Sequence, residues 1–167
     1  MNRRLLFWSL FLGGVLLDQI IKIWARGAMP PGGSLGGKPF PGFFEFTLVF
    51  NEGVAFGRMQ GYGYLMAPIA IAIAGVAAWW SWKNPQDPKW HHTTAALLAA
   101  GAVGNLIDRL LFKKVTDMFH ARFINFPVFN LADVLISVAA GMLFLTWLLE
   151  AIRERKAAVN PDSAPEV

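Results

Sequence analysis

Residues Gly101–Asp133, GAVGNLIDRLLFKKVTDMFHARFINFPVFNLAD, contain three Asp and three Asn residues and lie between and within two apolar helical runs. Asp108 falls inside the apolar run that precedes this segment's polar centre, and Asp133 falls inside the run that follows it. A carboxylate at the centre of a membrane helix costs about 2.5–3.5 kcal/mol. Acids placed at such a cost indicate function, and the segment also contains Asp117, Asn105, Asn125 and Asn130.

The composition around this segment is that of a membrane protein. The 167 residues are 55% hydrophobic and 16% charged, with a mean hydropathy of +0.43. Such a chain has more apolar surface than a soluble domain of this size can bury. A helix needs roughly 20 apolar residues to cross a bilayer. The sequence therefore predicts an all-α integral membrane protein, a bundle of four transmembrane helices at about Leu5–Ile23, Tyr62–Trp82, Thr93–Phe112 and Val128–Leu149.

Charge and cysteine content narrow the possible partners. The net charge of +4 comes from basic residues at the ends of the spans, which suits lipid headgroups and gives no stripe for nucleic acid. The chain has no cysteine, which excludes disulfides, Cys-ligated zinc and thiol catalysis. Arg3 and Arg4 before the first run resemble the start of a secretory signal peptide. Because apolar residues resume after Asp18-Gln19, we favour a retained first span.

The connection between the first two spans has two parts. Gly27–Pro41 is rich in Gly and Pro without a period, which predicts a loop. Phe43–Phe50 alternates aromatic and β-branched residues with polar ones, which predicts a strand. We therefore expect a small periplasmic β-sheet or flap between helices one and two. Residues 1–156 would form a single membrane domain, and 157–167 a disordered tail.

Two further groups of polar residues have mainly structural interpretations. Asp18 and Lys22 are spaced i,i+4 on one helix face and would relieve each other's desolvation as a structural ion pair. His91 and His92 fall in the predicted polar turn Lys83–His92. Adjacent residues on a helix point about 100° apart, so these two cannot bind one metal together, and we expect interfacial histidines.

The order of the spans places the remaining polar residues near one membrane face. With four spans, the loop containing Asn51 and the loop containing Asp117 lie on the same side, and Asp133 opens the fourth span beside them. Two close carboxylates share a proton near neutral pH, which suits aspartic peptidase chemistry. Nearby polar groups such as Asn105, Asn130 and Arg109 could position substrate. A polar network that only ties the helices together fits this spacing equally well.

The motifs then resemble those of the bacterial lipoprotein signal peptidases, or signal peptidase II, and the resemblance covers nearly the whole chain. Five short motifs occur in the family's order, and together they are far more specific than any one alone. They are Asp18-Gln19…Lys22, Asn51-x-Gly53-x-Ala55-Phe56-Gly57, Gly101-Ala-x-Gly104-Asn105-x-x-Asp108-Arg109, Val115-x-Asp117-x-Phe119 and Phe129-Asn130-x-Ala132-Asp133.

The resemblance implies an aspartic endopeptidase of the bacterial inner membrane, with cytoplasmic termini and an active site near the periplasmic face. Its substrates would be prolipoproteins, cleaved just before a diacylglyceryl-modified cysteine within membrane lipid, and globomycin-type antibiotics would inhibit it. No cofactor or metal is implied. Asp117 and Asp133 match the catalytic pair, and the supporting positions are Asn51, Gly53, Asn105, Asp108, Arg109 and Asn130.

Two positions depart from the family pattern and bear on the shape of the pocket. Val134 follows the second catalytic Asp where the family usually has a small residue, and Met118 separates Asp117 from Phe119. The alternative function is a small non-enzymatic carrier or scaffold that uses Asp108 and Asp133 as proton-relay groups. Carriers usually contain internal repeats or discontinuous helices, and we find no repeat between the two halves of this chain.

Overall fold

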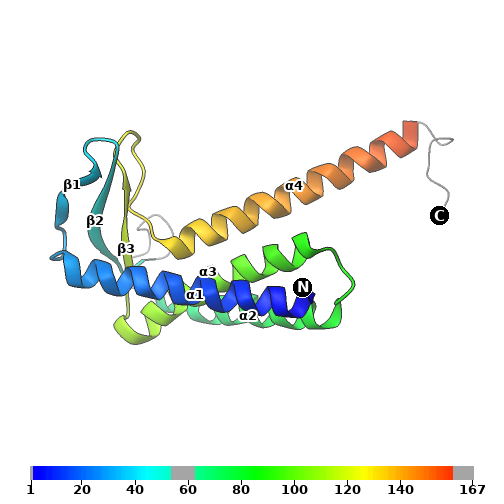
Figure 1. Ribbon diagram of the computed structural model, residues 1–167, viewed down its shortest axis with the longest axis horizontal. Helices are drawn as coiled ribbons and strands as arrows, with labels where there is room; N and C mark the ends of the chain where they lie inside the picture. Colours follow the sequence, from blue (N-terminus) through cyan, green and yellow to red (C-terminus); the bar gives the residue numbers. More distant parts are fainter. Residues whose placement is uncertain (1, 54–62, 160–167) are drawn as a thin grey trace.

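A computed structural model describes residues 2–53 and 63–159 of the chain. Its order of elements is α1 (Arg3–Ala28), β1 (Ser34–Phe40), β2 (Phe44–Asn51), the short 3₁₀ helix η1 (Gly63–Leu65), α2 (Met66–Lys83), α3 (Lys89–Phe112), β3 (Val115–Ala121) and α4 (Leu131–Val159). The four helices form the body of the molecule, and the sheet stands at one end of it (Figure 1). The predicted helical bundle with a small sheet is therefore confirmed in outline.

Three of the helices have the length and apolar composition needed to cross a bilayer. They are Arg3–Ala28, Lys89–Phe112 and Leu131–Ala158. Half of the apolar stretch of α3 is buried inside the protein, against 22% for α1 and 6% for α4. Large apolar side chains such as Leu12, Ile23 and Phe144 are exposed on the outer helices, as expected for surfaces that face lipid. The central helix of the bundle is therefore α3.

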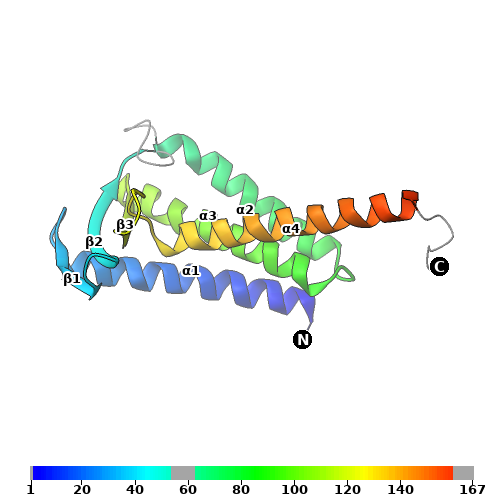
Figure 2. The same ribbon diagram turned by 90° about the horizontal axis from the view of Figure 1, so that it is seen from above.

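The helix α2 is shorter, with 18 residues, and ends in a segment rich in tryptophan. The guanidinium of Arg4 donates a hydrogen bond of 3.1 Å to the Trp82 carbonyl, so the end of α2 lies beside the start of α1. Viewed from above, α2 runs along the bundle between the sheet end and the far end (Figure 2). The chain thus returns from the sheet to the far end through α2.

Small residues let α3 approach its neighbours closely. A Cβ atom at Gly101 would collide with the carbonyl oxygen of Ala132 in the first turn of α4. A Cβ at Gly104 would lie 2.6 Å from the Asp18 carboxylate on α1. Neither position can accept a side chain without moving a neighbour. The two glycines therefore allow α1 and α4 to bring polar groups against the middle of α3.

The sheet is larger than the sequence indicated, because it contains strands from two connections: the one between α1 and α2 and the one between α3 and α4. Its strands are antiparallel in the order β1-β2-β3. The prediction of a strand at Phe43–Phe50 is confirmed by β2, but the prediction of a loop over Gly27–Pro41 is wrong, because it contains the end of α1 and all of β1. The third strand comes from the connection between α3 and α4, where no strand was predicted. The sheet therefore carries Asp117 on β3.

Met118 faces the protein core from this strand. It is fully buried and packs in a cluster with Ala25, Met29 and Leu48. Because side chains alternate along a strand, Met118 points to the opposite side from Asp117. The unusual residue beside Asp117 therefore fills the space between α1 and the sheet.

The N-terminus of α3 also differs from the prediction. The helix begins at Lys89, four residues before the predicted start, so His91 and His92 are helical. His92 is completely buried, with Nδ1 2.9 Å from the Ser81 hydroxyl oxygen and Nε2 3.1 Å from the Asn84 carbonyl oxygen. The interfacial placement predicted for His92 is therefore wrong, because this side chain ties α2 to α3.

At the other end of the chain, α4 continues to Val159, three residues into the tail predicted from Ala157. Residues 160–167 lie outside the described part of the chain. The motif residues Ala55, Phe56 and Gly57 also lie outside it, since the description of this connection stops at Gly53.

Candidate active site

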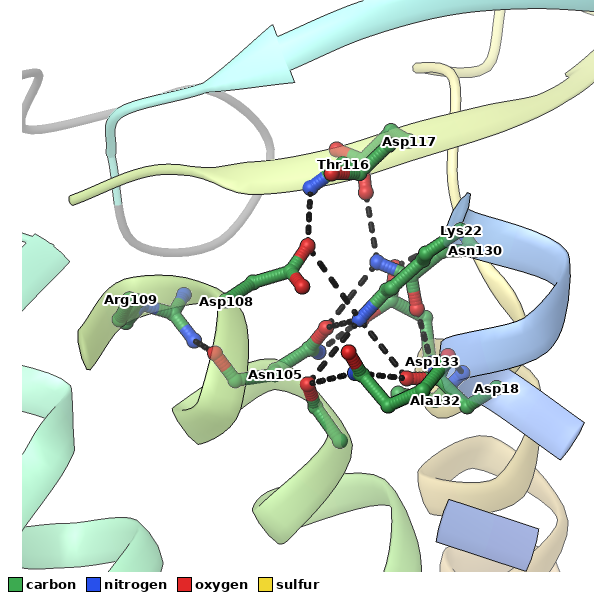
Figure 3. A network of polar contacts seen from close by, with 12 residues as sticks. Asp18, Lys22, Asn105, Asp108, Arg109, Thr116, Asp117, Asn130, Ala132 and Asp133 are labelled. Carbon is green, nitrogen blue, oxygen red and sulfur yellow. Dashed lines mark hydrogen bonds and ion pairs between the residues drawn. The ribbon is translucent and has the colours of Figure 1, made fainter. Parts of the chain in front are cut away.

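Asp117 and Asp133 converge on a single residue, Asn130 (Figure 3). The side-chain amide of Asn130 donates a hydrogen bond of 2.6 Å to Asp117 Oδ1. The backbone N–H of the same residue donates a 3.1 Å hydrogen bond to Asp133 Oδ2. One residue thus links a carboxylate on the sheet to a carboxylate on α4.

The Asn130–Asp133 pair is also the N-terminal cap of α4. Asn130 immediately precedes the helix, and its Oδ1 accepts a 3.0 Å hydrogen bond from the backbone N–H of Asp133. The Asp133 side chain bonds back to the Asn130 N–H, which completes a capping box. The i,i+3 spacing of these residues therefore satisfies two free N–H groups at the helix start. It also fixes the Asp133 carboxylate against the helix end.

Asn105 joins this pair to the middle of α3. Its Nδ2 donates a hydrogen bond of 2.9 Å to Asp133 Oδ1. Its Oδ1 accepts two hydrogen bonds, one of 3.1 Å from Asn130 Nδ2 and one of 2.9 Å from Lys22 Nζ. Both oxygens of Asp133 consequently accept an N–H hydrogen bond, in the first turn of a helix. These contacts fix the orientation of the Asp133 carboxylate at the start of α4.

Two further buried acids hold the backbone next to the pair. Asp18 accepts a 2.9 Å hydrogen bond from the N–H of Ala132, the residue before Asp133. Asp108 accepts a 2.8 Å hydrogen bond from the N–H of Thr116, the residue before Asp117. Each acid thus anchors the chain one residue ahead of one member of the Asp117–Asp133 pair.

Lys22 is the cation shared by these two anchoring acids. Its ammonium nitrogen lies 2.9 Å from Asp18 Oδ2 and 3.8 Å from Asp108 Oδ2, and all three side chains are completely buried. Arg26 adds a second cation, 3.5 Å from Asp108 and 2.7 Å from the Thr116 hydroxyl oxygen. The ion pair expected for Asp18 and Lys22 is therefore part of a larger network that reaches the sheet.

The Asp117 carboxyl group is buried next to another acid. Only 2% of the residue is exposed, and burial, the largest cause, acts together with the neighbouring charge of Asp133 to raise the pKa of this carboxyl group from 3.8 to about 7. Hydrogen bonds from the amides of Asn130 and Asn51 act in the opposite direction on this pKa. Asp133 is half-buried. Near neutral pH, Asp117 can therefore hold a proton.

The remaining predicted residues lie around this pair. Arg109 Nη1 donates a hydrogen bond of 3.4 Å to the Asn105 carbonyl oxygen. The buried Nε of Arg109 has no hydrogen-bond partner within residues 2–53 and 63–159. Asn51 pairs with Val115 at the β2–β3 register, two residues from Asp117, and its Oδ1 accepts from the N–H of Gly53. Gly53 is buried and its backbone N–H donates to Asn51, so its contribution is to the turn after Asn51.

The sequence interpretation missed Arg26, Thr116 and Ala132. Asp18, Lys22 and Arg26 are spaced four residues apart and so share one face of α1, which is the signal that could have identified Arg26. Thr116 and Ala132 take part through backbone N–H groups, which every residue except proline possesses. No residue type could have pointed to those two contacts.

Comparison with known proteins supports one family for this chain. A model of the family described as Signal peptidase (SPase) II matches residues 10–149, which include every residue of the site. A lipoprotein signal peptidase of Synechocystis sp. is 39% identical over 142 residues, covering 85% of this chain and 86% of that protein. A lipoprotein signal peptidase of Lactococcus lactis subsp. lactis is 34% identical over 148 residues, covering 89% and 97%.

A solved structure agrees with these sequence matches. A bacterial membrane enzyme determined by the in meso method at 2.3 Å resolution superposes with a TM-score of 0.80 and 26% sequence identity, covering 96% of this chain and 93% of that one. The shared fold includes the apolar helices described above. The chain therefore belongs to the signal peptidase II family and is a multi-pass membrane protein.

Proposed function

We propose that this protein is an aspartic endopeptidase that removes the signal peptide from prolipoproteins, on the N-terminal side of a diacylglyceryl-modified cysteine. The observation that carries the proposal is the convergence of Asp117 and Asp133 on Asn130, at the sheet end of a membrane bundle. Relatives 32–39% identical to this chain carry the name lipoprotein signal peptidase. A carrier function has no comparable support in the family to which the chain belongs.

The chemistry follows from the different surroundings of the two acids. Asp133 accepts two N–H hydrogen bonds at a helix start and acts as the base, taking a proton from the attacking water. Asp117, protonated through its raised pKa, donates its proton to the oxygen of the scissile carbonyl as the water oxygen bonds to the carbon. When the C–N bond breaks, the proton held by Asp133 moves to the leaving amine, and Asp117 takes back a proton from one hydroxyl of the tetrahedral diol as the carbonyl of the new carboxylic acid forms. One water is consumed, and the pair returns to its single-proton state.

We further propose that α2 is a fourth span and that the site lies near the periplasmic face. Since α1 ends at the sheet and α3 starts at the far end, the chain must cross back through α2 if both neighbours cross. Arg3, Arg4, Arg153, Arg155 and Lys156 lie at the ends of α1 and α4 remote from the sheet, which favours cytoplasmic termini. The sheet end would then face the periplasm, where the lipid-modified cysteine of a prolipoprotein is expected.

The proposal is tested by incubating purified protein, in phosphatidylcholine nanodiscs, with a diacylglyceryl-modified prolipoprotein. Release of the signal peptide is followed by mass spectrometry, with and without a globomycin-type inhibitor. The wild type should cleave on the N-terminal side of the modified cysteine, while Asp117→Asn and Asp133→Asn should each be inactive. The control is Glu154→Gln, an acid removed from an exposed position on α4. Full turnover by either Asn variant would overturn the proposal.

Folding of the two variants must be measured alongside, because the structure predicts unequal effects. Asn at position 117 keeps a side-chain oxygen that can still accept the hydrogen bond from Asn130. Asn at position 133 places an NH₂ group against one of two N–H donors, which loses a hydrogen bond worth about 1 kcal/mol. Asp117→Asn is therefore the cleaner test of catalysis.

A further inference from the structure

A second site is available at the opposite end of the bundle from the two catalytic acids. An apolar groove of about 780 Å³ lies between α2 and α4, and α3 forms its floor. The residues Ile73, Val76 and Trp80 line one wall, Leu143 and Trp147 line the other, and Leu98 lies on the floor. In the two views, α4 extends past the rest of the bundle at this end (Figures 1 and 2). The groove therefore opens sideways, where lipid surrounds the protein.

Two carboxylates stand at the outer end of this groove. Asp87, in the turn before α3, is half-buried, and Glu150 is on the last turns of the α4 wall. Neither forms an ion pair within residues 2–53 and 63–159. His91 also lines the groove and packs against Trp80. The site thus combines a long apolar channel with unpaired negative charge at one end.

A signal peptide has the complementary pattern. It consists of a positively charged n-region, an apolar h-region of roughly 7–15 residues and a short segment before the cleavage site. Held against α4, the h-region would occupy the apolar groove, and the n-region would meet Asp87 and Glu150. The positive charge of a signal peptide is at its N-terminal end only. If that end lies at Asp87 and Glu150, the cleavage end points toward the catalytic acids.

The dimensions agree with this placement. Glu150 follows Asp133 by 17 positions on α4, a separation of roughly 26 Å along the helix axis. A helical h-region spans about 10–22 Å, and three extended residues before the scissile bond add about 10 Å. A peptide cleaved at Asp133 therefore has its basic n-region at the level of Glu150.

We propose that the groove between α2, α3 and α4 binds the signal-peptide helix of the substrate, with Asp87 and Glu150 binding its basic n-region. The proposal rests on the proposed peptidase function for the identity of the ligand. The occupant is a peptide rather than a phospholipid because the unpaired charge lies at a single end, at the distance a signal peptide requires.

The test measures binding separately from cleavage. A fluorescent synthetic signal peptide that ends before the cysteine cannot be cleaved, and its dissociation constant is measured in phosphatidylcholine nanodiscs at low ionic strength. A second peptide has glutamine in place of each n-region lysine. Wild-type protein should bind the lysine peptide more tightly than the glutamine peptide. We expect a factor of about five in affinity for each lysine that contacts Asp87 or Glu150, because one Lys near an anionic surface raises binding affinity by about that factor. The double variant Asp87→Asn/Glu150→Gln should bind both peptides with equal affinity.

Two further variants separate the groove from general charge effects. Glu154→Gln removes an exposed acid one turn beyond Glu150 and outside the groove, so it should keep the preference for lysine. Ala72→Trp fills the groove from an exposed position on α2 and should weaken binding of both peptides. Thermal unfolding confirms that each variant is folded.

Three outcomes would overturn the inference. They are equal wild-type affinity for the two peptides, a preference that persists in the double variant, and a groove-filling variant that binds both peptides normally, as a lipid-filled groove would give. Loss of cleavage by the wild type in the nanodisc assay would instead contradict the peptidase function, and the peptide affinities would still decide the binding site.

Discussion

Replacing Lys22 with methionine is the sharpest test of how the candidate active site is held together. The ammonium group is completely buried between Asp18 and Asp108. It also donates hydrogen bonds of 3.2 Å to the Gly104 carbonyl oxygen and 2.9 Å to Asn105 Oδ1. Methionine has a similar length and flexibility but no charge and no donor. Lys22→Met therefore removes the shared cation with little change in volume.

The structure sets the size of the effect. Removing one partner of a buried ion pair costs about 3–5 kcal/mol, because the other charge remains buried. Asp108 keeps Arg26 at 3.5 Å and the Thr116 N–H, whereas Asp18 has no second cation among the described residues. Most of the cost should therefore come from Asp18. At about 2–4 °C per kcal/mol for a chain of this length, the unfolding midpoint should fall by on the order of 10 °C.

A second substitution shows whether the stranded charge is the cause. In Lys22→Met/Asp18→Asn no unpaired carboxylate remains at position 18, and the amide oxygen can still accept from the Ala132 N–H. The double variant should therefore be more stable than Lys22→Met alone. Intrinsic tryptophan fluorescence during heating in nanodiscs measures both. The control Lys83→Met, at the exposed end of α2, should change stability by less than about 0.5 kcal/mol.

Two results would refute this reasoning. The first is unfolding of Lys22→Met at the wild-type temperature, which would mean that other groups compensate the buried charges. The second is a double variant no more stable than Lys22→Met, which would assign the loss to packing instead of to Asp18.

The other predictions concern single acids and pH. Asp18→Asn should destabilise the protein less than Lys22→Met does, because Lys22 keeps Asp108 and two neutral acceptors; equal losses of melting temperature would contradict this. Cleavage measured as kcat/KM should fall as pH rises through about 7, where the pair loses its shared proton, and a flat profile up to pH 9 would exclude Asp117 as the acid. The raised pKa also means that the folded state binds this proton more tightly than the unfolded state. Wild-type stability should therefore decrease by about 1.4 kcal/mol per unit between about pH 4 and 7 relative to Asp117→Asn, as denaturant unfolding at several pH values would show.

Hydropathy predicted the helices well because burial in lipid depends on local composition. The runs at Leu5–Ile23 and Thr93–Phe112 correspond to α1 and α3, although both helices are longer than predicted. The extension of α1 carries Ala25, which is buried against the sheet, and Arg26, which reaches Asp108. These residues are helical because they pack on protein, and an apolar window cannot detect that.

The strands β1 and β3 depended on contacts distant in sequence. The segment Val115–Ala121 contains Asp117 and His120, and its strand conformation comes from pairing with β2, more than 60 residues earlier. β1 contains glycines at positive φ, such as Gly36 and Gly37, which a local pattern assigns to a loop. Each strand became visible only beside its partner.

The polar residues around Asp117 and Asp133 were predicted by motif, but their contacts come from the three-dimensional arrangement. Asp18 was expected in an ion pair, and Asp108 was expected as a supporting residue. In the structure, Asp18 accepts a hydrogen bond from the backbone N–H just before Asp133, and Asp108 accepts one from the backbone N–H just before Asp117. Lys22 lies between them and also binds Asn105, which in turn binds Asp133.

This arrangement explains why the chain keeps so many charges at the level of its membrane helices. The two acids of the proposed peptidase come from different elements, β3 and α4, so their relative position cannot be fixed by one helix or one strand. Apolar packing tolerates shifts between elements, whereas a directional hydrogen bond to a buried carboxylate does not. Asp18 and Asp108 supply such bonds to both elements, and Lys22 makes their two negative charges tolerable in the same place. The desolvation cost of three buried charges is thus the condition for holding Asp117 and Asp133 against the same residue, Asn130.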